Sequence, residues 1–305
     1  MYCRKDLLGT RDLTKSELES ILDHAAEMEK IVDAKRQSDL LRGKSVFLAF
    51  YENSTRTQSS FDHAVKILGG RSVALSVGTS SVKKGEVLLD TFETLQALQA
   101  DAVVIRHECS GAPQFLAERL DCAVVNAGDG LNEHPTQCLL DLYTMRKHFG
   151  KKLDGLNVLI CGDIKHSRVA RSNIWALNTL KANVSVCAPA TLMPSGSFPV
   201  TVKDSFDEGI READVVMLLR MQKERQHAGL IPGAEEYRTY YQLTPKRLSM
   251  MNRDAIIMHP GPINRGVEIS SEAADSSHSV ILEQVRAGLL VRMAVLDILT
   301  HGGKV

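Results

Sequence analysis

The sequence predicts an α/β protein with two doubly wound parallel-sheet domains and a cleft between them. The chain has 305 residues, enough for about two domains that each bury a core. Short apolar runs rich in valine and isoleucine alternate with helical patterns, which is typical of parallel sheets covered by helices. This series restarts after the segment GKKLDG, so we place the first domain at residues 1–149 and the second at residues 150–284.

The first domain is predicted to open with a helix over residues 13–34 that a serine or threonine caps. Four strands follow, in the segments SVFLAFYE, RSVALSVG, DAVVIRHE and CAVVNAG. Helical patterns lie between or after them, in TQSSFDHAVKILGG and HPTQCLLDLYTMRKHFG. In the last segment the apolar residues recur with a period near 3.6, as in an amphipathic helix.

The second domain is predicted to contain four strands, in LNVLICGD, NVSVCAP, ADVVMLLR and DAIIMHP. The segment APATLMPSGSFPV is rich in proline, glycine and serine and is predicted to be a loop. A long closing helix over residues 278–300 should be broken near Gly288, because glycine weakens helices. We expect its last part, about residues 285–305, to pack back on the first domain.

Composition excludes several classes of protein. Lys plus Arg and Asp plus Glu both total 37, so no net charge attracts nucleic acid or an anionic membrane. None of the six cysteines has C-x-x-C spacing, so we expect reduced thiols and no zinc site. The first residues have no apolar signal core, and no apolar run approaches about 18 residues. We therefore expect a cytoplasmic protein without a membrane span.

Polar residues gather where the predicted strands end, which is where open α/β sheets bind their ligands. The first strand leads into Ser54, Thr55, Arg56 and Thr57, which would form the first turn of the next helix. Free backbone N–H groups, hydroxyls and a guanidinium at such a turn suit a phosphate group. A capped helix with a solvated arginine explains this segment, taken alone, equally well.

Four further strand ends carry side chains of the same kinds. These are Arg106 with His107, His134 with Gln137 on a helix start, Arg168, and Arg220 with Gln222; a fifth segment contributes Pro260 and Gly261. Each arginine alone favours a surface ion pair, and His134 alone favours a structural role. Together they favour an anion-binding site. The sequence contains no nucleotide-binding glycine motif and no obvious metal cluster, so we expect no cofactor and no metal.

Six segments, in order, resemble the catalytic chain of aspartate carbamoyltransferases. They are STRT, SVKKGEVLLDT, HPTQCLLDLYT, GDIKHSRVARS, LLRMQKER and HPGPINRGVEI, and they extend from Ser54 to Ile269. Ornithine carbamoyltransferases share the first and third segments but usually carry S-M-G and H-C-L-P at the amino-acid end. This chain has RMQKER and HPGP there. It departs from the aspartate family at Gln58, where an arginine is usual, and at Asn53, where alanine or proline is common.

The resemblance implies transfer of a carbamoyl group from carbamoyl phosphate to L-aspartate, in pyrimidine biosynthesis. It implies that Arg56, Arg106, His134 and Lys84 are catalytic. The residues implied for carbamoyl phosphate are Ser54, Thr55, Arg56, Thr57, Ser80, Lys84, Arg106, His134 and Gln137. Those implied for aspartate are Lys84, Arg168, Arg220, Gln222, Pro260 and Gly261.

The resemblance also implies a homotrimer with shared active sites, because Ser80 and Lys84 match a loop that reaches into a neighbouring subunit. The sequence does not decide whether the protein associates with a regulatory chain or with a dihydroorotase. Two alternatives remain for the activity. One is a carbamoyltransferase for another amino-acid acceptor, and the other is an inactive homologue that keeps an anion-binding pocket.

Overall fold

The computed structural model describes residues 2–75, 87–194, 196, 198–221 and 233–302. The chain divides into two compact units. Unit 1 consists of Met1–Tyr143 and Arg286–Val305, and unit 2 consists of Thr144–Val285. Each unit contains one parallel sheet, which confirms the predicted fold class; the cleft between the domains and the boundary near residue 150 stay predictions.

The sheet of unit 1 contains the four predicted strands. They are β1 (Ser45–Phe50), β2 (Arg71–Leu75), β3 (Ala102–His107) and β4 (Ala123–Asp129). All neighbours are parallel and the order is β2-β1-β3-β4. The chain therefore passes from β1 to β2 on one side and continues with β3 on the other, so the strand order reverses between β1 and β3.

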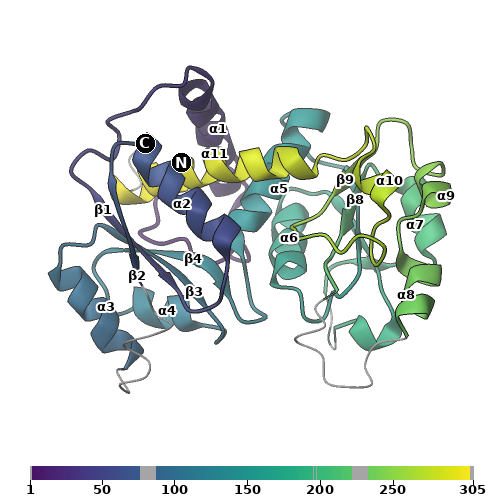
Figure 1. Ribbon diagram of the computed structural model, residues 1–305, viewed down its shortest axis with the longest axis horizontal. Helices are drawn as coiled ribbons and strands as arrows, with labels where there is room; N and C mark the ends of the chain where they lie inside the picture. The colour runs from purple at the N-terminus through teal and green to yellow at the C-terminus, as the bar shows by residue number, and fades with distance from the viewer. Residues whose placement is uncertain (1, 76–86, 195, 197, 222–232, 303–305) are drawn as a thin grey trace. The chain divides into compact units, whose positions relative to one another are not determined.

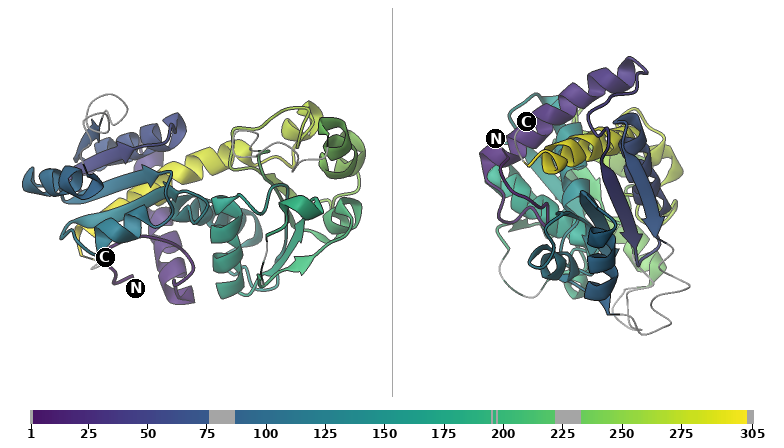
Figure 2. Two further views of the ribbon diagram at one scale, coloured as in Figure 1. Left: turned by 90° about the horizontal axis from the view of Figure 1, so that it is seen from below. Right: turned by 90° about the vertical axis from the view of Figure 1, so that its left-hand side faces the viewer.

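Helices cover both faces of this sheet (Figures 1 and 2). They are α1 (Lys15–Asp33), α2 (Thr55–Ile67), α3 (Leu88–Ala97), α4 (Ala112–Ala117), α5 (Pro135–Phe149, which extends into unit 2) and α11 (Ile281–Thr300, which begins there). On one face α3 and α4 bury Phe92, Leu95 and Leu116 against the sheet. On the other lie α2 and α11, and α1 is tied to α11 by an ion pair between His24 and Asp297.

The opening helix begins as its sequence predicts. Thr14 is the N-cap of α1, and its hydroxyl and the Glu17 carboxylate form a capping box. The same carboxylate accepts hydrogen bonds from Nε and Nη2 of Arg4, at 2.6 and 3.0 Å. The residues before the helix are thereby held on its first turn.

The sheet of unit 2 has the order β7-β6-β5-β8-β9, and all its strands are parallel. Its strands are β5 (Asn157–Cys161), β6 (Asn183–Cys187), β7 (Thr201–Val202), β8 (Val215–Leu218) and β9 (Ile256–Met258). Its helices are α6 (Arg168–Thr179), α7 (Phe206–Glu212), α8 (Ala234–Tyr241), α9 (Pro245–Leu248) and α10 (Ser271–Ala274). Figure 1 shows α6 on one face of this sheet and α7 on the other.

One prediction about secondary structure was wrong. The closing helix α11 is continuous through Gly288. A Cβ atom at this position would lie 2.4 Å from Nη1 of Arg292, so the glycine leaves room for a guanidinium instead of ending the helix. The segment 188–200 is a loop where it is described, apart from a short 3-10 helix at Ala190–Leu192. The two-residue strand β7 that follows it was not predicted.

None of the helices that the structure describes combines the length and the apolar composition that a membrane span requires. All six cysteines have free thiols.

Candidate active site

The first turn of α2 has the form that the sequence predicted. Ser54 is the N-cap of α2, and Thr55, Arg56 and Thr57 form the first turn. The Ser54 hydroxyl donates a hydrogen bond to Oγ1 of Thr57 at 2.9 Å and does not cap the helix backbone. Arg56 is exposed to solvent. No side-chain hydrogen bond caps α2, and the positive end of a helix dipole favours an anion.

Arg106 lies beside this turn in the topology, because β1 and β3 are neighbours and Phe50 is in register with Arg106. Its Nη1 donates to the carbonyl oxygen of Ala127 at 3.2 Å, and its Nε lies 3.3 Å from the carboxylate of Glu52. The guanidinium is thus held at the carboxyl ends of three adjacent strands. In an open α/β sheet this switch point is the usual ligand site.

His107 ends β3, and its ring packs on Tyr51 with 4.8 Å between the centroids. Burial lowers the pKa of His107, and its Nδ1 accepts a hydrogen bond from the N–H of Cys109 at 2.9 Å. These contacts hold the ring against the end of β1.

The loop between β4 and α5 carries His134, which is only 5% exposed. The buried carboxylate of Asp129 accepts hydrogen bonds from Nδ2 of Asn126 at 2.7 Å and from the N–H of Glu133 at 3.1 Å. The Glu133 carboxylate in turn accepts from the N–H and the hydroxyl of Thr10, at 2.6 and 2.9 Å. This network fixes the loop immediately before the histidine. Sequence reasoning missed Asp129 and Glu133, although acidic residues in the short segment before His134 were a usable signal.

Gly130 is required by the same loop. Its φ is 46°, and a Cβ atom there would lie 2.4 Å from Oγ of Ser110 and 2.7 Å from the carbonyl oxygen of Glu108. The backbone of the loop after β3 therefore approaches Gly130 too closely for any side chain. The glycine allows the loop that carries His134 to pack against the end of β3.

Gln137 is buried three residues after His134, in the first turn of α5. Its Nε2 donates a hydrogen bond to Oδ1 of Asp141 at 3.0 Å. Unit 1 thus places the α2 turn, Arg106, His134 and Gln137 at or after the carboxyl ends of the neighbouring strands β1, β3 and β4.

Unit 2 presents a second group of predicted residues at the carboxyl ends of β5, β8 and β9, which are neighbours in its sheet. Arg168 is the first residue of α6 and is 4% exposed. Its helix is capped by Ser167, whose hydroxyl accepts from the N–H of Ala170 at 3.1 Å. Arg220 lies two residues beyond the end of β8 and is half-buried.

Pro260 and Gly261 follow β9 and are supported by His259. Nδ1 of His259 accepts a hydrogen bond from the N–H of Gly261 at 2.8 Å, which leaves the ring proton on Nε2. That nitrogen lies 3.1 Å from Oε1 of Glu268, and both side chains are buried. Sequence reasoning assigned no role to His259 or Glu268, because their spacing matches no catalytic motif.

Three predicted site residues, Ser80, Lys84 and Gln222, lie outside the described residues. Within the described ranges, no group of three or more histidine, cysteine or acidic side chains is arranged to hold a metal ion.

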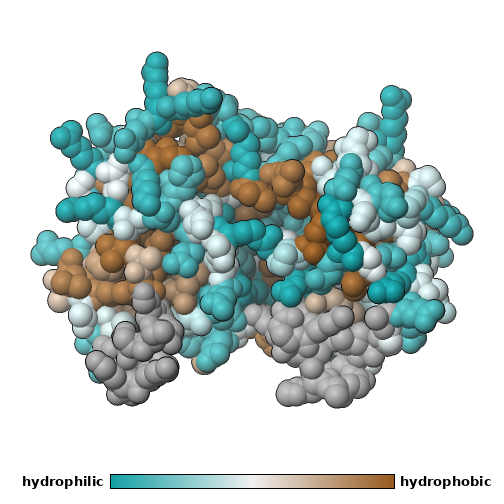
Figure 3. All heavy atoms as spheres, viewed as in Figure 1, coloured by the Kyte–Doolittle hydropathy of each residue, from teal (hydrophilic) through white to brown (hydrophobic). Residues whose placement is uncertain are grey.

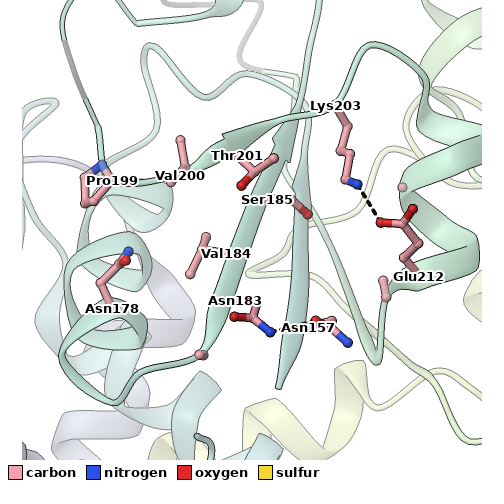
Figure 4. Close-up of a pocket in the computed structure, with 13 residues that line it drawn as sticks. Asn157, Asn178, Asn183, Val184, Ser185, Pro199, Val200, Thr201, Lys203 and Glu212 are labelled. Atoms are coloured by element: carbon pink, nitrogen blue, oxygen red, sulfur yellow. Dashed lines mark hydrogen bonds and ion pairs between the residues drawn. The ribbon is translucent and has the colours of Figure 1, made fainter. Parts of the chain in front are cut away.

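A separate hollow in unit 2 contains none of the predicted site residues (Figure 4). Asn157 and Asn183, which begin β5 and β6, line it together with Lys203 and Glu212. The last two form an ion pair of 2.5 Å between Nζ and Oε2. This hollow lies at the amino ends of the strands, at the opposite edge of the sheet from Arg168 and Arg220.

Two protein-family profiles match the chain, one over each half. The profile described as "Aspartate/ornithine carbamoyltransferase, carbamoyl-P binding domain" matches residues 5–147. The profile described as "Aspartate/ornithine carbamoyltransferase, Asp/Orn binding domain" matches residues 154–299. The chain belongs to the aspartate/ornithine carbamoyltransferase family.

Relatives within this family match nearly the whole chain. The aspartate carbamoyltransferase catalytic subunit of Caldanaerobacter subterraneus subsp. tengcongensis is 51% identical over 298 residues, which cover 97% of this chain and 98% of the relative. The protein of the same name from Azorhizobium caulinodans is 51% identical over 303 residues, covering 98% and 94%.

Solved carbamoyltransferase structures are similar throughout. The catalytic subunit of the M. jannaschii aspartate transcarbamoylase has a TM-score of 0.86 and 35% identity, and the match covers 98% of each chain. Aspartate transcarbamoylase from Trypanosoma cruzi, in complex with carbamoyl phosphate and aspartate, has a TM-score of 0.87 and 29% identity, covering 96% of this chain and 95% of that one.

Proposed function

We propose that this chain is an aspartate carbamoyltransferase. It transfers the carbamoyl group of carbamoyl phosphate to the amino group of L-aspartate, and the products are N-carbamoyl-L-aspartate and phosphate. The observation that carries the proposal is the arrangement in unit 1, where the uncapped first turn of α2 and the guanidinium of Arg106 occupy one switch point. The relatives that share 51% identity bear the name of this enzyme.

Carbamoyl phosphate is the substrate for which unit 1 is suited. Ser54, Thr55, Arg56 and Thr57 bind the phosphate group through the helix N-terminus and through charge-assisted hydrogen bonds. Ser80 and Lys84 add to this site on the basis of the sequence resemblance.

The reaction places negative charge on the carbonyl oxygen. The aspartate amine attacks the carbonyl carbon, the bond from this carbon to the phosphate oxygen breaks, and the departing phosphate accepts the amine proton. Arg56, Arg106 and His134 point donors at the oxygen while its charge grows. A preorganised donor of this kind contributes about 2.7–4 kcal/mol to lowering the barrier. Gln137 binds the carbamoyl amide.

Aspartate is the acceptor for which unit 2 is suited. Arg168, Arg220 and Gln222 bind its two carboxylates, because a guanidinium fork matches a carboxylate. Lys84, Pro260 and Gly261 complete this site.

Initial rates with aspartate, with ornithine and with N-acylated amino acids test the choice of acceptor. We expect product from aspartate alone; turnover of ornithine and not aspartate would refute the assignment.

The Arg220→Ala variant should lose at least about tenfold in kcat/KM for aspartate, since a charge-assisted contact is worth about 1.5–3 kcal/mol. Its binding of carbamoyl phosphate should change little. Absence of all carbamoyl transfer in the folded wild-type chain would favour an inactive anion-binding homologue.

The sequence resemblance supports a homotrimer in which Lys84 of one subunit completes the site of its neighbour. Edge strand β2 is largely exposed in the single chain, and Val73, Val87 and Leu98 are among the exposed apolar residues of unit 1. Figure 3 shows apolar surface over the region of β2 and α3. Such a surface is typical of a contact with another subunit.

Complementation tests the shared site. Arg56→Ala and Lys84→Ala homotrimers should each be nearly inactive. When equal amounts are denatured together and refolded, roughly a quarter of the sites should recover, because random assembly pairs an intact Arg56 with an intact neighbouring Lys84 at that frequency. If Lys84 acts within its own chain, mixing restores no activity.

We also propose a cellular setting, in line with the sequence-based expectation of reduced thiols. We place the enzyme in the cytoplasm, in the committed step of pyrimidine biosynthesis. Co-purification of the full chain with a regulatory chain or a dihydroorotase would identify a larger assembly; the relatives' designation as catalytic subunits supports the search for the former.

A further inference from the structure

A buried carboxylate behind the predicted carbamoyl phosphate site has no role in the proposed reaction. Asp141 lies on α5 one turn after Gln137 and is completely buried. Its Oδ1 accepts the hydrogen bond from Nε2 of Gln137 at 3.0 Å. Because an ionised carboxylate can only accept hydrogen bonds, it selects the NH₂ end of the amide. The carbonyl end, Oε1, is then directed away from Asp141.

A buried arginine from a distant part of the chain supports this carboxylate. Arg292 of α11 is 5% exposed. Burial lowers the pKa of Arg292 to about 10, although the negative charge of nearby Asp141 raises it. The guanidinium is therefore charged at neutral pH, and its charge attracts the carboxylate of Asp141.

The same guanidinium contacts α2, the helix whose first turn is predicted to bind the phosphate group. Nη1 of Arg292 donates a hydrogen bond to Oγ of Ser60 at 3.0 Å, and its Cζ lies 5.3 Å from the ring centroid of Phe61. Both residues belong to α2. Arg292 thus connects α2 with the charge that orients Gln137 on α5.

We propose that Asp141 is a positioning residue that orients the Gln137 amide so that its oxygen faces the carbamoyl group, and that Arg292 keeps Asp141 ionised. This inference rests on the proposed function. The carbamoyl NH₂ of the substrate is a hydrogen-bond donor and requires an acceptor. An amide turned the other way would present its own NH₂ to that group. The Gln137 amide, oriented by Asp141, therefore favours binding of an acyl phosphate that carries an NH₂ group over one that carries a methyl group.

The test compares two ligands that differ only at that position. Dissociation constants of carbamoyl phosphate and of acetyl phosphate are measured for the full chain, and their ratio gives the preference for NH₂. In the Asp141→Asn variant the oxygen of the new amide is drawn to Arg292, its NH₂ faces Gln137, and the Gln137 amide turns over. We expect the preference for carbamoyl phosphate to fall roughly three- to tenfold, as for the loss of one neutral hydrogen bond. The affinity for acetyl phosphate should stay unchanged.

A double-mutant cycle separates positioning from a general structural role. Gln137→Ala should lose the same preference, and the double variant Asp141→Asn with Gln137→Ala should lose no more than either single variant. Equal weakening of both ligands, additive losses, or an unchanged preference in Asp141→Asn would overturn the proposal.

Two further variants complete the design. Asp121 accepts a hydrogen bond from Nε2 of Gln96 at 3.2 Å on the surface of unit 1, so Asp121→Asn is a matched control that should change neither constant. If Asp141→Asn does not fold, Asp141→Leu with Arg292→Met removes both buried charges, a change that proteins often tolerate. This pair should fold and still lack the preference; a preference kept by the folded pair would refute the inference. Failure of the wild-type chain to form carbamoyl aspartate would refute the proposed function, whereas the ratio of the two constants tests Asp141 separately.

Discussion

Replacement of Arg106 by alanine is the most direct test of the site in unit 1. The structure indicates how much stability the change removes. The hydrogen bond from the guanidinium to the Ala127 carbonyl is of the charge-assisted kind, worth about 1.5–3 kcal/mol. The ion pair with Glu52 is partly exposed, with side-chain exposures of 15% and 21%, and adds at most about 1 kcal/mol.

The expected loss in the free energy of unfolding is about 1.5–4 kcal/mol. A folded protein typically has a free energy of unfolding of about 5–15 kcal/mol, which is larger. The variant should therefore remain folded, and its activity can be measured. Loss of one preorganised donor to the carbonyl oxygen should lower kcat by about 10²–10³-fold. The loss in catalysis thus greatly exceeds any decrease in the folded fraction.

The assay measures carbamoyl aspartate formation at saturating substrate concentrations, together with urea unfolding of the same preparation. Arg119→Ala is the matched control, because Arg119 is an exposed arginine of unit 1 that donates to the carbonyl oxygen of Phe115. Its kcat should equal that of the wild type. If folded Arg106→Ala keeps its kcat within about threefold of the wild type, Arg106 is only a cross-link between strand ends, and its proposed role as a donor to the carbonyl oxygen is refuted.

Three further predictions concern the loop before α5 and the first helix. His134→Ala should lose roughly a hundredfold in kcat and keep its fold, and a normal kcat would make His134 a structural residue. Gly130→Ala should lower the free energy of unfolding by about 1–3 kcal/mol, because its Cβ would lie 2.7 Å from a backbone oxygen, and it should also lower kcat; unchanged urea unfolding would contradict this. The hydrogen bond from Arg4 lowers the pKa of Glu17 from 4.5 to about 2, so its stabilising effect is present above about pH 4.5 and is lost as the pH falls toward about 2. The difference in Tm between the wild type and Glu17→Gln should shrink over that pH range, and a constant difference would refute the linkage.

Much of the fold was predictable from the sequence. Eight strands were predicted in order, as was the α2 turn that begins at Ser54, because strand and helix patterns depend on residues that are neighbours in the chain. The position of Arg106 followed from the same logic, since a polar residue at the end of an apolar strand marks the carboxyl edge of a parallel sheet. The roles of these residues at the site stay predictions.

The tertiary structure decided what supports the site. The Glu133 carboxylate is bonded to Thr10, 123 positions earlier, and Arg292 is bonded to Ser60, 232 positions away. Local patterns contain no information about such pairs. Gly288 illustrates the difference: its sequence context favoured a broken helix, whereas in the folded chain it makes room for the guanidinium of Arg292. The order of residues along the chain thus determined the elements and their ends, and packing between distant segments determined which buried charges face each other.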